Sequence, residues 1–100
     1  MTARYEHLTD AEFAAVVAEI APMIADYMHD EIERRHPEIA RLASRVRMAS
    51  GADIDAHEQA HGGFDVGTLL EVPYSEETQA ACAAYRAAVR AIYPTVRPRY

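Results

Sequence analysis

The chain has 100 residues, of which 50% are hydrophobic, and a formal net charge of -6 at pH 7. This length is typical of one domain, so we interpret residues 1–100 as a single helical domain. The acidic balance argues against binding to nucleic acid or to an anionic membrane. No apolar run approaches the length of a membrane span, and the single cysteine, Cys82, cannot form an internal disulfide, so we expect a cytoplasmic protein.

The composition also bears on source and assembly. Every basic residue is arginine, a bias that we attribute to the codon usage of a GC-rich bacterial genome. Alanine is the commonest residue, and few large apolar side chains remain to form a core. An isolated monomer would have a thin core, so we expect a homo-oligomer, and specifically a homodimer that pairs through the alanine-rich last helix.

A first helix is predicted to begin directly after Thr9. Thr9 is in position to cap the helix, Glu12 to close the capping box, and Leu8 to pack against Phe13. Apolar residues then recur at helical spacing. Pro22 removes one backbone hydrogen bond, so we expect a kink there before the helix continues to about residue 35.

The two sides of this helix differ in polarity. Glu31 falls on the apolar stripe although it is a carboxylate. The opposite side carries polar and charged residues, which at helical spacing usually face solvent. They are Asp26, His29, Asp30 and Glu33.

Two further helices are predicted in the middle of the chain. The pair His36-Pro37 favours a break followed by a helix over residues 37–49. Residues 50–53 are predicted to break this helix, with Ser50 or Asp53 capping a third helix that runs to His61 and ends at Gly62-Gly63. The arginines of the region form a local basic cluster, for which pairing with acidic residues is the simplest explanation. They are Arg34, Arg35, Arg41, Arg45 and Arg47.

The last part of the chain contains one clear helix. Residues 64–74 fit either a short helix or an extended segment that Pro73 ends. Ser75 caps a final helix, Pro94 stops it, and residues 94–100 form an extended arm that could lie on another subunit. The predicted fold is an all-α bundle of four main helices with room for a short fifth, kinked in its first helix and completed by dimerisation. Residues 1–7 form an N-terminal lead.

The stretch His57-Glu58-Gln59-Ala60-His61 is where residue types and spacing suggest chemistry. On a helix, histidines four residues apart share one side, where a single metal ion can bridge them. The pattern His-Glu-x-x-His resembles the zinc-binding helix of metallopeptidases, which implies His57 and His61 as metal ligands and Glu58 as the general base. The surroundings are predicted to be helical throughout, and no third histidine follows at the spacing of that family. We therefore discount peptide hydrolysis and keep metal binding.

The metal site needs further ligands. Glu31, on the apolar stripe of its own helix, is the candidate for the third ligand of zinc or iron, or for a hydrogen-bond acceptor of the histidines. Two Glu-x-x-His pairs, Glu33 with His36 and Glu58 with His61, are also similar to the ligand spacing of di-iron carboxylate bundles. The alternative is that the histidines of the motif are ordinary partly buried residues that hydrogen-bond to carboxylates or backbone carbonyls.

Two functions from different classes follow. The leading hypothesis is a polar interior pocket that binds a transition metal or a small ligand, with Glu58 moving the proton if the protein is a hydrolytic or oxidative enzyme. The alternative is a non-catalytic regulatory or interaction domain whose acidic and arginine-bearing faces recognise a partner protein. The sequence leaves open whether the protein is an enzyme.

Overall fold

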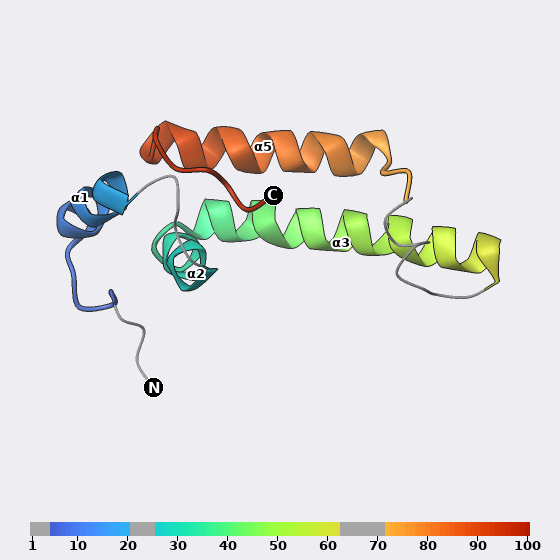
Figure 1. Cartoon of the computed structure of the whole chain (residues 1–100), viewed down its shortest axis with the longest axis horizontal. Coiled ribbons are helices and arrows are strands. Elements are labelled where there is room, and N and C mark those ends of the chain that lie inside the picture. Colours follow the sequence, from blue (N-terminus) through green and yellow to red (C-terminus); the bar gives the residue numbers. More distant parts are fainter. Residues whose placement is uncertain (1–4, 21–25, 63–71) are drawn as a thin grey trace.

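The computed structural model describes residues 5–20, 26–62 and 72–100, without the side chains of Asp26 and His61. Four α-helices are present in these ranges, and no strand: α1 (Asp10–Ile20), α2 (Asp26–Arg35), α3 (Pro37–His61) and α5 (Glu76–Ile92) (Figure 1). The prediction of an all-α fold is confirmed. Pro22, with its expected kink, and most of the segment that fits two interpretations lie outside the described residues.

The local signals for helix ends are confirmed. The Thr9 hydroxyl accepts a hydrogen bond from the Glu12 amide (3.1 Å), and the Glu12 carboxylate accepts one from the Thr9 amide (2.9 Å), which is the reciprocal capping box. Pro37 occupies the first turn of α3, and Gly62 ends that helix in the left-handed conformation (φ 71°). The Ser75 hydroxyl caps α5 by accepting a hydrogen bond from the Thr78 amide (3.2 Å).

The expected break at residues 50–53 is wrong, because α3 is one continuous helix of 25 residues. The polar side chains that suggested a break, Ser50 and Asp53, form hydrogen bonds that leave the helical backbone of α3 intact. The Ser50 hydroxyl donates to the Arg47 carbonyl (3.3 Å). The Asp53 carboxylate accepts hydrogen bonds from the Ser75 amide (2.9 Å) and from the Thr78 hydroxyl (2.6 Å), so it caps the neighbouring helix α5 rather than its own. These bonds hold the pKa of Asp53 below its usual value.

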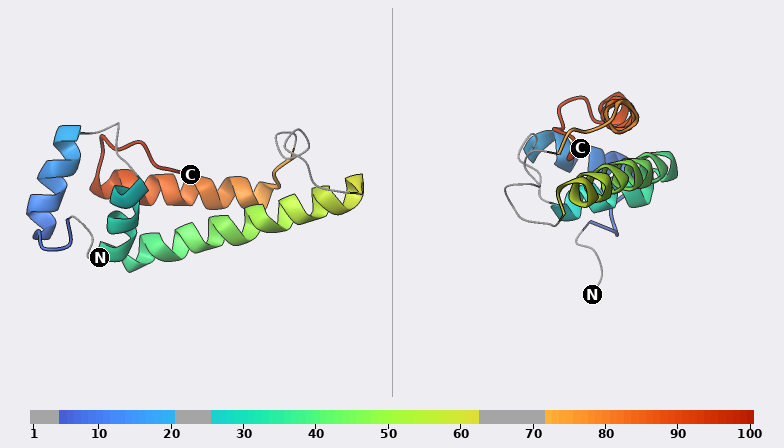
Figure 2. Two further views of the ribbon diagram at one scale, coloured as in Figure 1. Left: turned by 60° about the horizontal axis from the view of Figure 1, so that its bottom comes forward. Right: turned by 90° about the vertical axis from the view of Figure 1, so that its right-hand side faces the viewer.

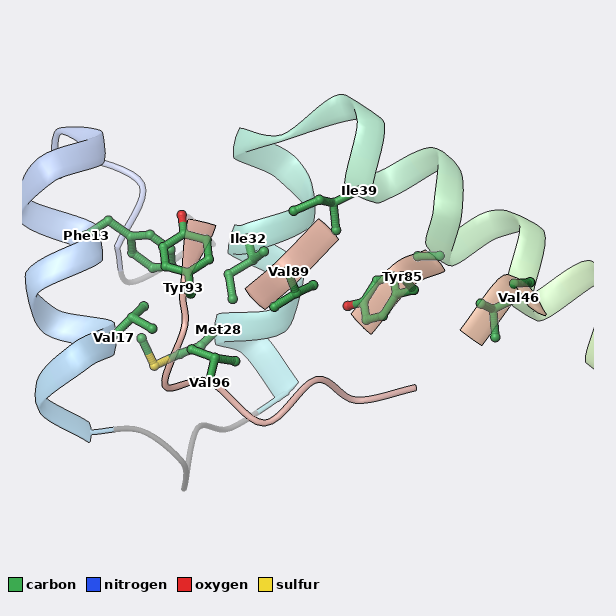
Figure 3. Close-up of a cluster of buried hydrophobic side chains, with 12 residues drawn as sticks. Phe13, Val17, Met28, Ile32, Ile39, Val46, Tyr85, Val89, Tyr93 and Val96 are labelled. Carbon is green, nitrogen blue, oxygen red and sulfur yellow. The ribbon is translucent and has the colours of Figure 1, made fainter. Parts of the chain in front are cut away.

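The long helices α3 and α5 lie side by side, while α1 and α2 gather at one end of this pair (Figures 1 and 2). The buried core lies mainly at that end, where all four helices and the C-terminal arm meet (Figure 3). On α3 the described core cluster extends only from Ile39 to Val46. The last turns of α3 pass beyond the start of α5, which gives a molecule of 49 × 28 × 21 Å. The twelve residues of the core cluster are Phe13, Val17, Met28, Ile32, Ile39, Ala43, Val46, Ala81, Tyr85, Val89, Tyr93 and Val96.

The polar side of α2 is less exposed than expected. Asp30 faces solvent, but His29 and Glu33 are buried, with relative exposures of 5% and 9%. Part of the reason is the arm of residues 94–100, which folds back over α2 and α5 of its own chain. Val96 of the arm is buried in the core, and Arg99 binds Glu33 directly.

Candidate functional site

The residues of the expected metal site are divided between two ends of the molecule. His57 and Glu58 are half-buried near the C-terminal end of α3, and His61 is the last residue of that helix. Glu31 is buried in α2, at the opposite end of α3 (Figure 1). At about 1.5 Å per residue, His57 lies roughly 30 Å along α3 from Pro37. Because α3 does not break and fold back, the structure does not bring Glu31 to the histidines of the same chain.

The histidine pair itself keeps the spacing that the sequence suggested. Since α3 is helical through its last residue, positions 57 and 61 are one turn apart on one side of the helix. Glu58 borders a shallow hollow of about 360 Å3, together with Asp55, Gln59 and Gly62, so its carboxylate is accessible to small solutes. Among the side chains that the structure describes, no three from His, Cys, Asp and Glu are close enough to hold a metal ion together.

Glu31 belongs to an ion-pair cluster at the junction of α1 and α2. Its carboxylate accepts hydrogen bonds from Arg34 Nε (2.8 Å) and from Arg35 Nε (2.6 Å). The bond from Arg34 is the largest cause that lowers the pKa of Glu31, and Arg35 lowers it further. The carboxylate is therefore ionised at neutral pH and hydrogen-bonded to two guanidinium groups. Its role in this structure is to hold these two arginines in place.

Arg35 uses the rest of its guanidinium to hold the N-terminal segment. It donates to the Asp10 carboxylate (2.7 Å), to the Tyr5 carbonyl (2.8 Å) and to the Leu8 carbonyl (2.6 Å). The guanidinium carbon also lies 4.7 Å from the centre of the Phe13 ring. The side chain is only 5% exposed. Arg35 thus ties α2 to the start of α1 through hydrogen bonds, charge and ring contact.

A second cluster, centred on Glu33, holds the C-terminal arm. The Glu33 carboxylate accepts hydrogen bonds from the Tyr85 hydroxyl (3.0 Å) and from Arg99 (2.5 Å), and Arg47 approaches to 3.8 Å. Arg99 also pairs with Asp30 at 3.0 Å. Burial is the largest cause that raises the pKa of Tyr85, and the adjacent Glu33 carboxylate adds to it. This hydroxyl is a hydrogen-bond donor and a poor acid.

Sequence reasoning missed this cluster because its members are far apart in the chain. Glu33 and Arg99 are separated by 66 residues, and Glu33 and Tyr85 by 52. The available signal was weak: the arm contains two arginines, two prolines and one tyrosine, and acidic residues lie on α2. Composition of that kind does not say which carboxylate an arginine will meet.

The described residues thus form two structural ion-pair clusters. A half-buried histidine and a half-buried carboxylate lie near the end of α3, and one groove lies along α5. No helix in the described ranges combines the length and the apolar character that crossing a membrane requires. Comparison with protein-family models, with curated proteins and with solved structures found no match to this chain.

Proposed function

We propose that this protein is a non-catalytic interaction domain that associates with a second copy of itself through the outer face of α5. The observation that carries the proposal is a ridge of exposed alanines on that face. Their spacing of three and four residues puts them on one side of the helix, and small side chains allow two helices to approach closely. This alanine ridge consists of Ala80, Ala83, Ala87 and Ala91.

The shape of the chain supports association. Its radius of gyration is 15.8 Å, whereas a compact domain of this length has about 13 Å. Beyond α1 and α2, the described helices α3 and α5 continue side by side as one pair (Figure 2). A second copy packed on α5 would convert this pair into a four-helix arrangement, in which the alanine ridge is shielded from water.

The charges at the two ends of α5 favour an antiparallel pair. Glu76 and Arg90 lie two turns on either side of Ala83. An antiparallel pair centred on Ala83 places Arg90 beside the partner's Glu76, whereas a parallel pair places like charges together. Exposed ion pairs contribute less than about 1 kcal/mol each, so these charges would select the direction of pairing more than its strength.

The test is the mass of the protein in solution, measured by sedimentation over a range of concentrations. We expect a dimer that Ala83→Glu converts to a monomer, because two carboxylates would meet at the two-fold axis. The matched control is Ala56→Glu, at an exposed position on α3, which should leave the dimer intact. Glu76→Arg or Arg90→Glu alone should weaken the dimer, and the double exchange should restore it. A wild-type chain that stays monomeric at every concentration would overturn the proposal.

Metal binding at the end of α3 is the second candidate, and the unbroken helix through positions 57 and 61 favours it. The pair supplies two of the four ligands of a tetrahedral zinc site, so the others would come from water or from another molecule. With metal bound, the neighbouring Glu58 would be the candidate general base. Iron is the other metal that these residue types suit.

Elemental analysis of untagged protein separates this candidate from the first. Metal binding predicts zinc or iron in a fixed ratio to chain, lost in the His57→Ala, His61→Ala double variant and kept in His7→Ala, which changes an exposed histidine. Equal metal content in both variants would show adventitious binding. Metal-free protein that still dimerises would leave self-association as the function.

A further inference from the structure

A groove of about 450 Å3 lies along one side of α5. Pockets that hold small molecules typically measure about 300–1,000 Å3, so this groove is large enough for a small organic ligand. The described residues that line it are Tyr74, Thr78, Gln79, Cys82 and Arg86. They span about 12 Å of helix from Thr78 to Arg86.

The lining is apolar along most of its length and cationic at one end. Tyr74 is 44% exposed and Cys82 is half-buried, so both residues offer apolar surface. The polar groups beside them are already engaged: the Thr78 hydroxyl donates to Asp53, and the Gln79 amide donates to the Tyr74 carbonyl (3.0 Å). The guanidinium of Arg86 is the charged group among the described lining residues.

Arg86 already binds one oxygen presented along α5. Its Nε donates to the Tyr100 carbonyl (2.7 Å) where the arm returns beside the helix, and the Tyr100 ring packs on Tyr85 with 5.0 Å between centroids. A guanidinium has five N–H donors, and its planar edges match a carboxylate. No Asp or Glu side chain among the described residues forms an ion pair with Arg86.

We infer that this groove binds a small organic acid with an apolar chain. The carboxylate would lie against Arg86, and the chain would extend over Cys82 towards Tyr74. The remaining guanidinium N–H groups would donate hydrogen bonds to the carboxylate, and the apolar chain would be buried against the side of α5. The groove lies beside the alanine ridge and not on it, so the inference does not depend on self-association.

Cys82 provides the test, because it is the only cysteine of the chain and lines the groove. We expect octanoate to slow alkylation of Cys82 by iodoacetamide in a saturable way. Arg86→Gln should raise the octanoate concentration needed for half-maximal protection roughly tenfold or more, the effect of losing a charge-assisted hydrogen bond. The matched control is Arg45→Gln, which changes an exposed arginine of α3 outside the described groove lining. Octanoate should protect Cys82 in this variant as it does in the wild type.

Three results would overturn the inference. Octanol has the same chain without the charge, so protection of Cys82 by octanol as strong as that by octanoate would indicate simple apolar partition. Equal weakening of protection in Arg86→Gln and Arg45→Gln would indicate a general effect of positive charge. The third result combines two measurements. Titration calorimetry of Cys82→Ala with octanoate should give the same affinity as the alkylation assay gives for the wild type. The site would be excluded if calorimetry detected no binding heat and octanoate did not slow alkylation of wild-type Cys82.

Discussion

Arg35→Ala is expected to lower the free energy of unfolding by about 3–5 kcal/mol, the cost typical of breaking a buried ion pair by removing one partner. The substitution removes the guanidinium that binds Glu31, Asp10 and two backbone carbonyls. Glu31, with 2% relative exposure, would keep only its contact with Arg34. Urea denaturation followed by circular dichroism measures the change.

Arg34→Ala is the matched control, because it removes the other guanidinium from the same carboxylate. The Arg34 side chain is 47% exposed, so we expect a loss of less than about 1 kcal/mol. Equal losses in the two variants would contradict the role assigned to Arg35.

The pH dependence gives a second readout of the same cluster. The folded pKa of Glu31 is lowered from 4.5, chiefly by Arg34 and then by Arg35. The stabilisation is therefore complete above pH 4.5 and is lost as the pH falls through the lower folded value, because the unfolded state then binds the extra proton. In Arg35→Ala this acid-side loss should become smaller, since less of the pKa shift remains.

Arg99→Ala should lower the free energy of unfolding by about 2–4 kcal/mol, somewhat less than a fully buried pair because its side chain is 20% exposed. The variant would leave Glu33 buried with the Tyr85 hydroxyl as its close partner and would free the arm from α2. Denaturation measures the stability, and hydrogen exchange of residues 94–100 measures release of the arm.

Arg97→Ala is the control for the arm. Arg97 is exposed, and its removal should change stability by no more than about 0.5 kcal/mol. A double-mutant cycle between Glu33→Gln and Arg99→Ala should show coupling, because the two side chains form one ion pair. Independent, additive effects would contradict the role assigned to the Glu33–Arg99 pair.

The helix ends were predictable from the sequence because their causes are local. Thr9 with Glu12, Pro37 after His36, and Ser75 before Glu76 each act within one turn of the chain. The interruption expected at residues 50–53 failed for the opposite reason. Asp53 carries the signal of a cap, but the residue that it binds, the N-cap Ser75 of α5, lies 22 residues later. Only the folded structure shows that the two are neighbours.

The candidate site was predictable where it depends on one helix, and not where it depends on how two helices pack. The spacing of His57 and His61 requires only that α3 be helical, which the structure shows. The expected role of Glu31 required two helices to converge, and no local pattern specifies that. The burial of Glu31 on an apolar stripe was visible in the sequence, but its actual partners, Arg34 and Arg35, follow within four residues on the same helix.

The uneven distribution of the core along α3 has a consequence for local unfolding. The contact of Asp53 with Ser75 marks where α5 begins, and the described core cluster on α3 has already ended at Val46. Unwinding the last two turns of α3 therefore breaks few buried contacts among the described residues, while opening the other end requires nearly global unfolding. His57 and His61 lie in these last turns. A ligand that binds both histidines would bind only the helical state of these turns. Binding would therefore make this end of α3 more ordered, and a variant with a more stable helix end would bind the ligand more tightly.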